Sequence, residues 1–186
     1  SNQNSAQVVP GAATLVLDAS GKGGVALWRH EEFDGTNTTV RLHGNSYHGY
    51  NNPPGPQLIA SQLVDEHADA TLNRPVSAYD GAATDTGAVF AFVQNDGTSD
   101  ELYIRGYRGK GDHIDLPGTP SRDNGTAGAI GTVRVMAAAG DDGTVFFLQD
   151  DGGGTIHLYG RLYKGADGSI SGLRGPAMNT PLSNIG

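Results

Sequence analysis

The stretch Leu102-Tyr103-Ile104-Arg105-Gly106-Tyr107-Arg108-Gly109 recurs 56 positions later as Leu158-Tyr159-Gly160-Arg161-Leu162-Tyr163-Lys164-Gly165. A weaker copy stands 60 positions upstream of the first as Leu42-His43-Gly44-Asn45-Ser46-Tyr47-His48-Gly49. The shared pattern is Leu-(Tyr/His)-x-(Arg/Asn)-x-Tyr-(basic)-Gly, in which x is any residue. Self-similarity at a nearly fixed spacing is typical of repeat architectures. The sequence therefore predicts three related units.

Each copy follows a glycine that opens an apolar run, at 24–28, 87–92 and 143–147. Two of the runs end in Asp-Gly turn sequences, at 94–97 and 149–152, which readily adopt the backbone angles of a tight hairpin. A further extended segment precedes each run, at 13–18, 75–80 and 133–139, and a weaker one can follow the motif, as at 57–60. No window has a sustained helical period. We expect units of three or four short antiparallel strands.

The length and composition indicate one all-β domain over residues 1–186. A chain of 186 residues is long enough for one continuous core, and 29 Gly and 9 Pro suit short strands and tight turns. The repeats are expected at about 8–62, 74–120 and 131–180, after a polar N-terminal arm at 1–7.

Charge and cysteine content limit the function classes. The net charge of −8, with no basic patch interleaved with aromatic residues, argues against nucleic-acid binding. No apolar segment that would insert into a membrane is found. The chain has no cysteine, which excludes disulfides and thiolate metal sites. This composition is compatible with an exported protein, so we expect an extracellular or cell-surface location.

The repeated strand would present a ladder of aromatic and hydrogen-bonding groups. Side chains alternate across a strand, so Tyr103 and Arg105 are expected on one face and Leu102 and Ile104 on the other. Such a ladder suits sugars, because a pyranose can lie on an aromatic ring while Arg donates to its hydroxyls. The same groups can equally fill the space between packed repeats. The candidate ligand-binding residues of the ladders are Tyr47, Tyr103, Arg105, Tyr107, Tyr159, Arg161 and Tyr163.

Two loops add further candidates. Tyr50 lies in a stretch stiffened by Pro53 and Pro54, and binding residues often stand on loops held by a rigid scaffold; a structural corner is the alternative. Asp96 and Asp100 could supply oxygen ligands to calcium, although ordinary hairpin turns use the same residues. No other cofactor is expected. No recognised nucleophile elbow, zinc-protease motif or phosphate-binding loop is found, so no catalytic residue is assigned.

The order Gly-x-Val-Phe, Gln-(Asn/Asp)-Asp-Gly and Leu-Tyr-x-Arg-x-Tyr-(Arg/Lys)-Gly resembles the blade sequences of bacterial β-propellers, including sialidase-like and lectin propellers. The resemblance covers about residues 10–180 and implies that each unit is a four-stranded antiparallel blade. The sialidase box Ser-x-Asp-x-Gly-x-Thr-Trp is absent, so the resemblance does not extend to sialidase activity. A β-trefoil-like fold, which closes three repeats within one chain, is the alternative.

Three blades are fewer than the four to eight with which propellers close, and would leave two open strand edges. Two copies could close a six-bladed ring, or a donated N-terminal strand could build a polymer. We therefore expect a non-catalytic exported binding protein, completed by self-association, with carbohydrate as its ligand class. The alternatives are a structural subunit of an extracellular filament or surface assembly, and a glycan-acting hydrolase or a fragment of one.

Overall fold

The computed structural model describes residues 14–17, 23–33, 38–48, 57–58, 62–63, 75–85, 87–95, 100–110, 113–115, 121–122, 129–138, 140–150 and 152–172. These residues form strands, turns and short connections, and no helix occurs among them. Within these ranges there is accordingly no helix long and apolar enough to cross a membrane.

The strands form three antiparallel sheets, one for each repeat. The first sheet contains β1 (Thr14–Leu17), β2 (Gly23–Phe33), β3 (Thr38–His48), β4 (Gln57–Leu58) and β5 (Gln62–Leu63). The middle sheet contains β6 (Val76–Ala83), β7 (Gly87–Asn95), β8 (Asp100–Lys110), β9 (His113–Asp115) and β10 (Ser121–Arg122). The third sheet contains β11 (Ile130–Ala137), β12 (Gly143–Asp150), β13 (Ile156–Tyr163) and β14 (Ile170–Gly172). The predicted all-β class is confirmed.

Two details differ from the expectation. The third sheet has four strands, but the first two sheets have five, because β5 and β9 add a second short strand beside β3 and β8. The described strands form three separate open sheets, not the single closed barrel of the β-trefoil alternative. Each of the short strands β4, β5, β9, β10 and β14 pairs with only two or three residues of a long one, so the long strands form the body of the protein.

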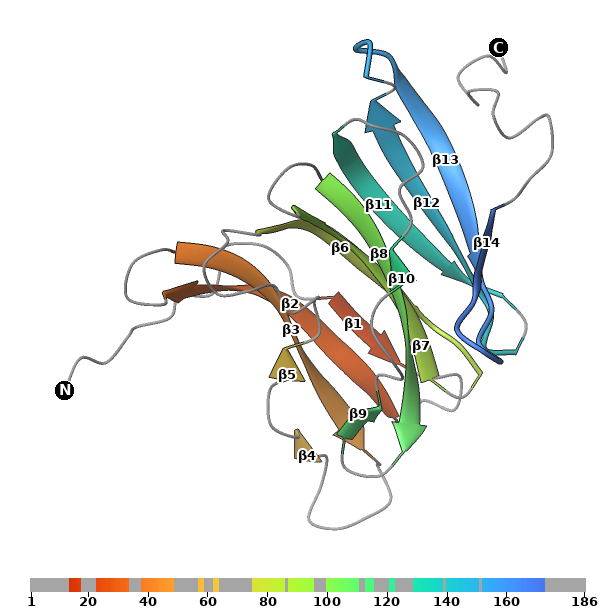
Figure 1. Cartoon of the computed structure of the whole chain (residues 1–186). Helices are drawn as coiled ribbons and strands as arrows, with labels where there is room; N and C mark the ends of the chain where they lie inside the picture. Colours follow the sequence, from red (N-terminus) through yellow and green to blue (C-terminus); the bar gives the residue numbers. More distant parts are fainter. Residues whose placement is uncertain are drawn as a thin grey trace.

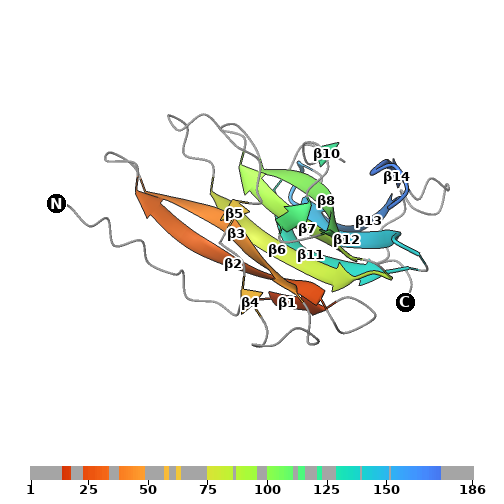
Figure 2. The same ribbon diagram turned by 90° about the horizontal axis from the view of Figure 1, so that it is seen from below.

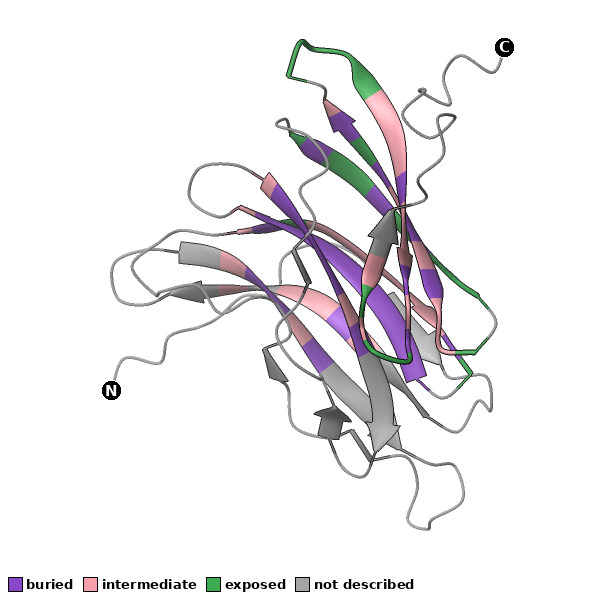
Figure 3. Cartoon of the chain, turned by 45° about the vertical axis from the view of Figure 1, so that its right-hand side comes forward, coloured by how far each residue is buried: buried purple, intermediate pink, exposed green. Residues whose placement is uncertain are grey.

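The sheets are stacked face to face in chain order, with the middle sheet between the other two (Figures 1 and 2). The burial patterns follow this order. Every residue of β7 from Gly87 to Gln94 is buried, whereas β12 alternates between buried and more exposed positions. The continuous apolar sequence of β7 therefore serves two interfaces, one on each face of its sheet. Figure 3 shows the buried residues concentrated in the middle sheet.

The interface between the first and middle sheets is built from one face of each. Leu27 and Leu42 of the first sheet are fully buried against the middle sheet. The middle sheet contributes Val76, Ala88, Phe90, Phe92 and Tyr103 to the same cluster. Arg29 Nη1 also donates to the Ser77 carbonyl at 2.7 Å. Apolar burial is reinforced here by a polar contact between the sheets.

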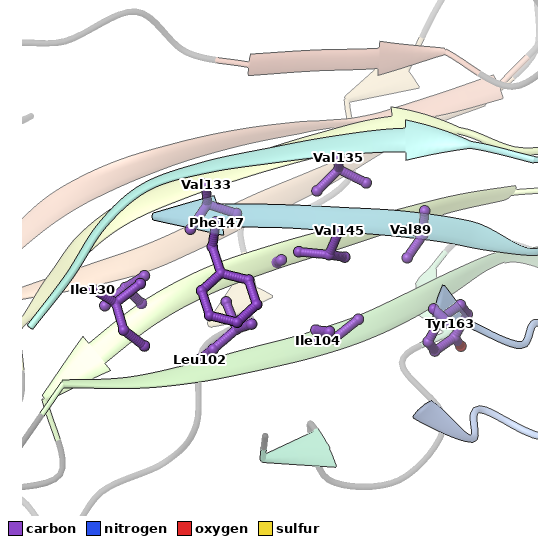
Figure 4. Packing of buried hydrophobic residues seen from close by; sticks show 11 residues of the cluster. Val89, Leu102, Ile104, Ile130, Val133, Val135, Val145, Phe147 and Tyr163 are labelled. Carbon is purple, nitrogen blue, oxygen red and sulfur yellow. The ribbon is translucent and has the colours of Figure 1, made fainter. Parts of the chain in front are cut away.

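The interface between the middle and third sheets is likewise built from one face of each. Val89, Leu102 and Ile104 point from the middle sheet toward the third (Figure 4). The third sheet meets them with Ile130, Val133, Val135, Val145, Phe147 and Tyr163. Neighbouring residues of β8 thus point to opposite interfaces, Tyr103 to one and Leu102 and Ile104 to the other, as strand alternation predicts.

Polar contacts join the middle and third sheets at their first strands, β6 and β11, which lie side by side. The Val135 N–H donates to Asp80 Oδ2 at 2.9 Å. Thr84 Oγ1 donates to Asp141 Oδ1 at 2.9 Å, and the Gly140 N–H donates to Asp85 Oδ2 at 3.0 Å. The first of these bonds joins the two strands, and the other two join the turns that follow them.

The turns use glycine and aspartate as the sequence predicted for residues 149–152. Gly152 has a positive φ of 86°, which disfavours a side chain at this position. Asp150 Oδ1 accepts from the N–H groups of Gly152 and Gly154, at 2.6 and 3.1 Å. The equivalent turn of the middle sheet, at 96–99, lies outside the described residues.

The turn between β11 and β12 carries a carboxylate, that of Asp142, whose pKa is lowered by contacts with the turn after β13. Lys164 Nζ donates to Asp142 Oδ2, and the Gly165 N–H donates to Asp142 Oδ1 at 3.0 Å. These two hydrogen bonds, that from Lys164 first, hold the pKa of Asp142 below its ordinary value of 3.8. A carboxylate whose pKa is lowered by folding stabilises the folded state at pH values above its ordinary pKa. This stabilisation is lost as the pH falls through the pKa of the folded state.

We expect Asp142→Asn to remove part of the acid sensitivity of the fold. The wild-type protein should lose free energy of unfolding between about pH 5 and pH 2, and the variant should lose less over that range. Urea unfolding at a series of pH values measures this, with Glu31→Gln as a carboxylate control in the first sheet. Equal pH dependence in Asp142→Asn and the wild type would show that the Lys164 contact does not stabilise the fold.

Candidate functional site

In the middle and third sheets, the described ladder residues lie on the face that each sheet turns to its predecessor. Each sheet carries a cross-strand ring pair at the first ladder position. Phe92 stacks on Tyr103 with ring centroids 5.3 Å apart, and Phe147 stacks on Tyr159 at 5.5 Å. In the first sheet, Trp28 stacks on His43 at 6.1 Å. The repeated sequence motif is therefore also a repeated packing motif.

Two of the predicted ligand-binding tyrosines are almost completely buried. Tyr103 is 3% exposed between the first and middle sheets, and Tyr163 is 5% exposed between the middle and third sheets. The ring of Tyr163 lies against Gly106 of β8, at a place where a Cβ would overlap its hydroxyl and ring. A sugar could reach either ring only if the sheets separated.

The arginines and Tyr159 are less buried. Arg105, Tyr159 and Arg161 are each half-buried. The Arg161 guanidinium lies over the Phe147 ring at 5.9 Å from its centroid, and its Nη1 donates to the Gly160 carbonyl at 3.2 Å. A guanidinium stacked on an aromatic ring is the packing arrangement that the sequence left open beside ligand contact.

Several predicted residues lie outside the described side chains. Tyr47 and Tyr107 belong to β3 and β8, where only their backbone is described, and Tyr50 and Asp96 lie outside the described residues altogether. Asp100 begins β8, where its Oδ1 accepts from Asn95 Nδ2 at 3.1 Å. In the part of the chain that the structure describes, no group of three His, Asp or Glu side chains could hold a metal ion. Calcium binding stays a prediction.

The contact between the middle and third sheets is close enough to require glycine at Gly143. A Cβ at this position would overlap the Val89 side chain, which branches at Cβ and has little freedom to move. By contrast, a Cβ at Gly131 would meet only the Leu148 carbonyl oxygen, at 3.9 Å. The two glycines belong to the same sheet but differ in the space around them.

We expect Gly143→Ala to destabilise the protein by about 1–3 kcal/mol through overpacking. Gly131→Ala should change the free energy of unfolding by much less. Adding Val89→Ala to Gly143→Ala should recover part of the loss, since the two side chains compete for one space. Chemical denaturation of the wild type, of the single variants Gly143→Ala, Val89→Ala and Gly131→Ala, and of the double variant measures these differences. Additive effects of Gly143→Ala and Val89→Ala would refute the proposed contact.

The third sheet has one face turned away from the middle sheet. The β12 and β13 register places Phe146, Leu148, Leu158 and Leu162 on this face, opposite to Val145 and Phe147. Leu148 is 38% exposed, and both Met136 of β11 and Ile156 of β13 are 60% exposed. We call this set the outer face: Met136, Phe146, Leu148, Ile156, Leu158 and Leu162.

The outer face corresponds to a buried face in the middle sheet. Phe92 and Phe147 occupy equivalent positions, because each stacks on the first tyrosine of its ladder. The residues that follow them, Val93 and Leu148, are therefore also equivalent. Val93 is fully buried against the third sheet, whereas Leu148 is exposed. The third sheet thus presents an apolar surface where the middle sheet has a neighbour. This surface, which sequence reasoning did not single out, is the candidate functional site.

The open ends of the stack are sheet faces and not the strand edges expected from the sequence, because neighbouring sheets meet through their faces. At the other end, the first sheet turns Trp28 and His43 away from the middle sheet, opposite to Leu27 and Leu42. The two end faces therefore differ in character. One is mainly aliphatic, and the other carries an aromatic stack.

Comparison of the chain with protein-family models, with curated proteins and with solved structures finds no match.

Proposed function

We propose that this chain is a non-catalytic, exported binding protein that is completed by self-association, with the first sheet of one copy covering the outer face of another. The observation that carries the proposal is the outer face itself. Its apolar residues occupy positions at which the middle sheet is buried by the next sheet. A large exposed apolar surface on a strand-rich protein is a common mark of a protein interface.

The partner that fits best is a second copy, because the chain already contains this type of interface twice. The face that each later sheet turns to its predecessor carries a stacked ring pair, Phe92 with Tyr103 or Phe147 with Tyr159. The free face of the first sheet carries the equivalent pair, Trp28 with His43. A copy placed on the outer face would continue the same stacking.

This association is head to tail, since it joins two different faces. Such contacts close into a ring when the rotation between copies allows it and otherwise extend as a filament. If the sheets are propeller blades, two copies supply six, within the range in which propellers close. Our second candidate function is a structural subunit of an extracellular filament. The difference between the two end faces supports a filament as well as it supports a ring.

Carbohydrate is the ligand class that we propose for the assembled protein. The support is the recurrence of Tyr and Arg in the ladders, of which Tyr159 and Arg161 keep part of their surface exposed. Tyr103 and Tyr163 do not belong to this proposal, because they are buried between sheets.

Light scattering on a sizing column, over a range of protein concentrations, tests the proposal. A chain of 19.2 kDa should elute with the mass of two chains if the ring closes. A polymer at the excluded volume would favour the filament. The mass of one chain at every concentration would contradict self-association.

A further inference from the structure

A pocket of about 270 Å³ lies where β2, β6 and β11, one strand from each sheet, come together. Its lining comes from all of them: Arg29 from β2, residues 77–79 of β6 and residues 131–134 of β11. None of the ladder residues lines it. The pocket therefore exists only when the three sheets are stacked, and none of the residues that define the outer face lines it.

Both β6 and β11 have a bulge at this pocket. In β6, Val76 and Ala78 pair with two consecutive residues of β7, so Ser77 between them is an extra residue. In β11, Ile130 pairs with Gln149 and Val133 pairs with Phe147. Two residues, Gly131 and Thr132, therefore lie opposite the single residue between Gln149 and Phe147. Bulges at equivalent places of two repeats re-aim the chain, and are frequent beside binding and active sites.

Two arginines give the pocket its chemistry. Arg29 Nη1 donates to the Ser77 carbonyl at 2.7 Å, and Arg134 Nη1 donates to the Val133 carbonyl at 2.7 Å. Each bond uses one of the five N–H groups of a guanidinium and holds the planar group at the pocket wall. Arg134 is exposed and Arg29 half-buried, so further N–H groups can face a ligand.

The charge of the lining is opposite to that of the whole chain. The protein has a net charge of −8, yet the lining contains two arginines and no Asp or Glu. Arginine pairs planar oxyanions through two parallel hydrogen bonds, a geometry that lysine does not offer. The half-buried ring of Tyr79 adds an apolar wall, and its hydroxyl donates to the Leu27 carbonyl at 3.3 Å.

We propose that this pocket binds the carboxylate group of a small ligand, with Arg29 and Arg134 as the residues that recognise it. The volume is below the range of drug-sized ligands and is of the order of a single small molecule. Acidic sugars and simple carboxylic acids share this chemistry. All of the lining residues belong to one chain, so a single copy contains the complete pocket.

Isothermal titration calorimetry with glucuronate, glucose and acetate at one ionic strength tests the proposal. Glucuronate should bind and glucose, which lacks the carboxylate, should not; the affinity for acetate shows whether a bare carboxylate is sufficient. Arg134→Gln should weaken glucuronate binding about tenfold or more, the effect of losing a charge-assisted hydrogen bond. Arg134→Lys should recover only part of it.

Lys164→Gln is the matched control, because it removes one positive charge in the turn after β13, outside the pocket. It should leave the affinity unchanged. Amide chemical shifts of Ser77 and Gly131 on titration provide a second measurement, which does not depend on any variant folding correctly. Equal binding of glucose, unchanged affinity in Arg134→Gln, or the absence of shifts at both bulges would overturn the proposal.

Discussion

Replacing Leu148 with Asp is expected to convert the self-associated protein into single chains that remain folded. Leu148 is 38% exposed on the outer face, so the substitution leaves the core between the sheets intact. In the assembly, however, the carboxylate would be buried in an apolar interface without a partner, which costs several kcal/mol. The measured mass should fall to that of one chain.

Ala166→Glu is a suitable control for this prediction, because it adds the same charge at an exposed position in the turn after β13. It should leave the mass unchanged, and circular dichroism should show the same strand signal for both variants. If Leu148→Asp keeps the wild-type mass, the outer face is not the interface. If it unfolds the chain, Leu148→Ser repeats the test with a smaller change.

Replacing Phe147 with Ala should produce the largest loss of stability. Phe147 is 1% exposed, lies in the core between the middle and third sheets, and stacks on Tyr159. Truncating a buried Phe costs about 3–5 kcal/mol through lost burial and the cavity left behind. For a chain of this size, the melting temperature should fall by at least about 6 °C.

The measurement is best made in the Leu148→Asp background, so that dissociation does not contribute to the unfolding transition. Ile156→Ala is the control there, since Ile156 is an aliphatic residue of the same sheet that is 60% exposed. It should change the free energy of unfolding by about 0.5 kcal/mol or less. Similar losses in Phe147→Ala and Ile156→Ala would contradict the assignment of the two faces.

Local patterns were sufficient to predict the long strands and the alternation of their faces, but not the additional short strands β5 and β9. The apolar runs opened by Gly87 and Gly143 became β7 and β12, and alternation correctly placed Tyr103 and Leu102 on opposite faces. These features depend on neighbours along the chain and across one hairpin. The sequence contains such information directly, in its period of two and in its turn residues.

The stacking order could not be predicted in the same way. Residues 145–148 read Val-Phe-Phe-Leu, as apolar as residues 89–92, yet only the middle sheet has a neighbour on both faces. Val93 is buried because a third sheet follows the middle one, and Leu148 is exposed because no fourth sheet follows among the described residues. For the same reason, the predicted ladder could not be divided in advance into buried rings and exposed ones.

The pocket illustrates a further limit. Arg29 and Arg134 are far apart in the sequence and come together only because β2, β6 and β11 meet where the three sheets are stacked. The bulges at Ser77 and Gly131 carry no distinct sequence signal, although both follow an aliphatic residue, Val76 or Ile130, that pairs with a buried glutamine. Tertiary contacts between sheets decide these features.

The most direct test of the central claim, that the stack continues from one copy into the next, uses the absence of cysteine in the chain. Ala26→Cys marks the free face of the first sheet and Leu148→Cys marks the outer face. The two variants, carrying tags of different length, are mixed and treated with a short bis-maleimide. A cross-linked product is predicted only in the mixture, between one chain of each kind. Cross-linking of Leu148→Cys to itself, or no product in the mixture, would contradict head-to-tail stacking.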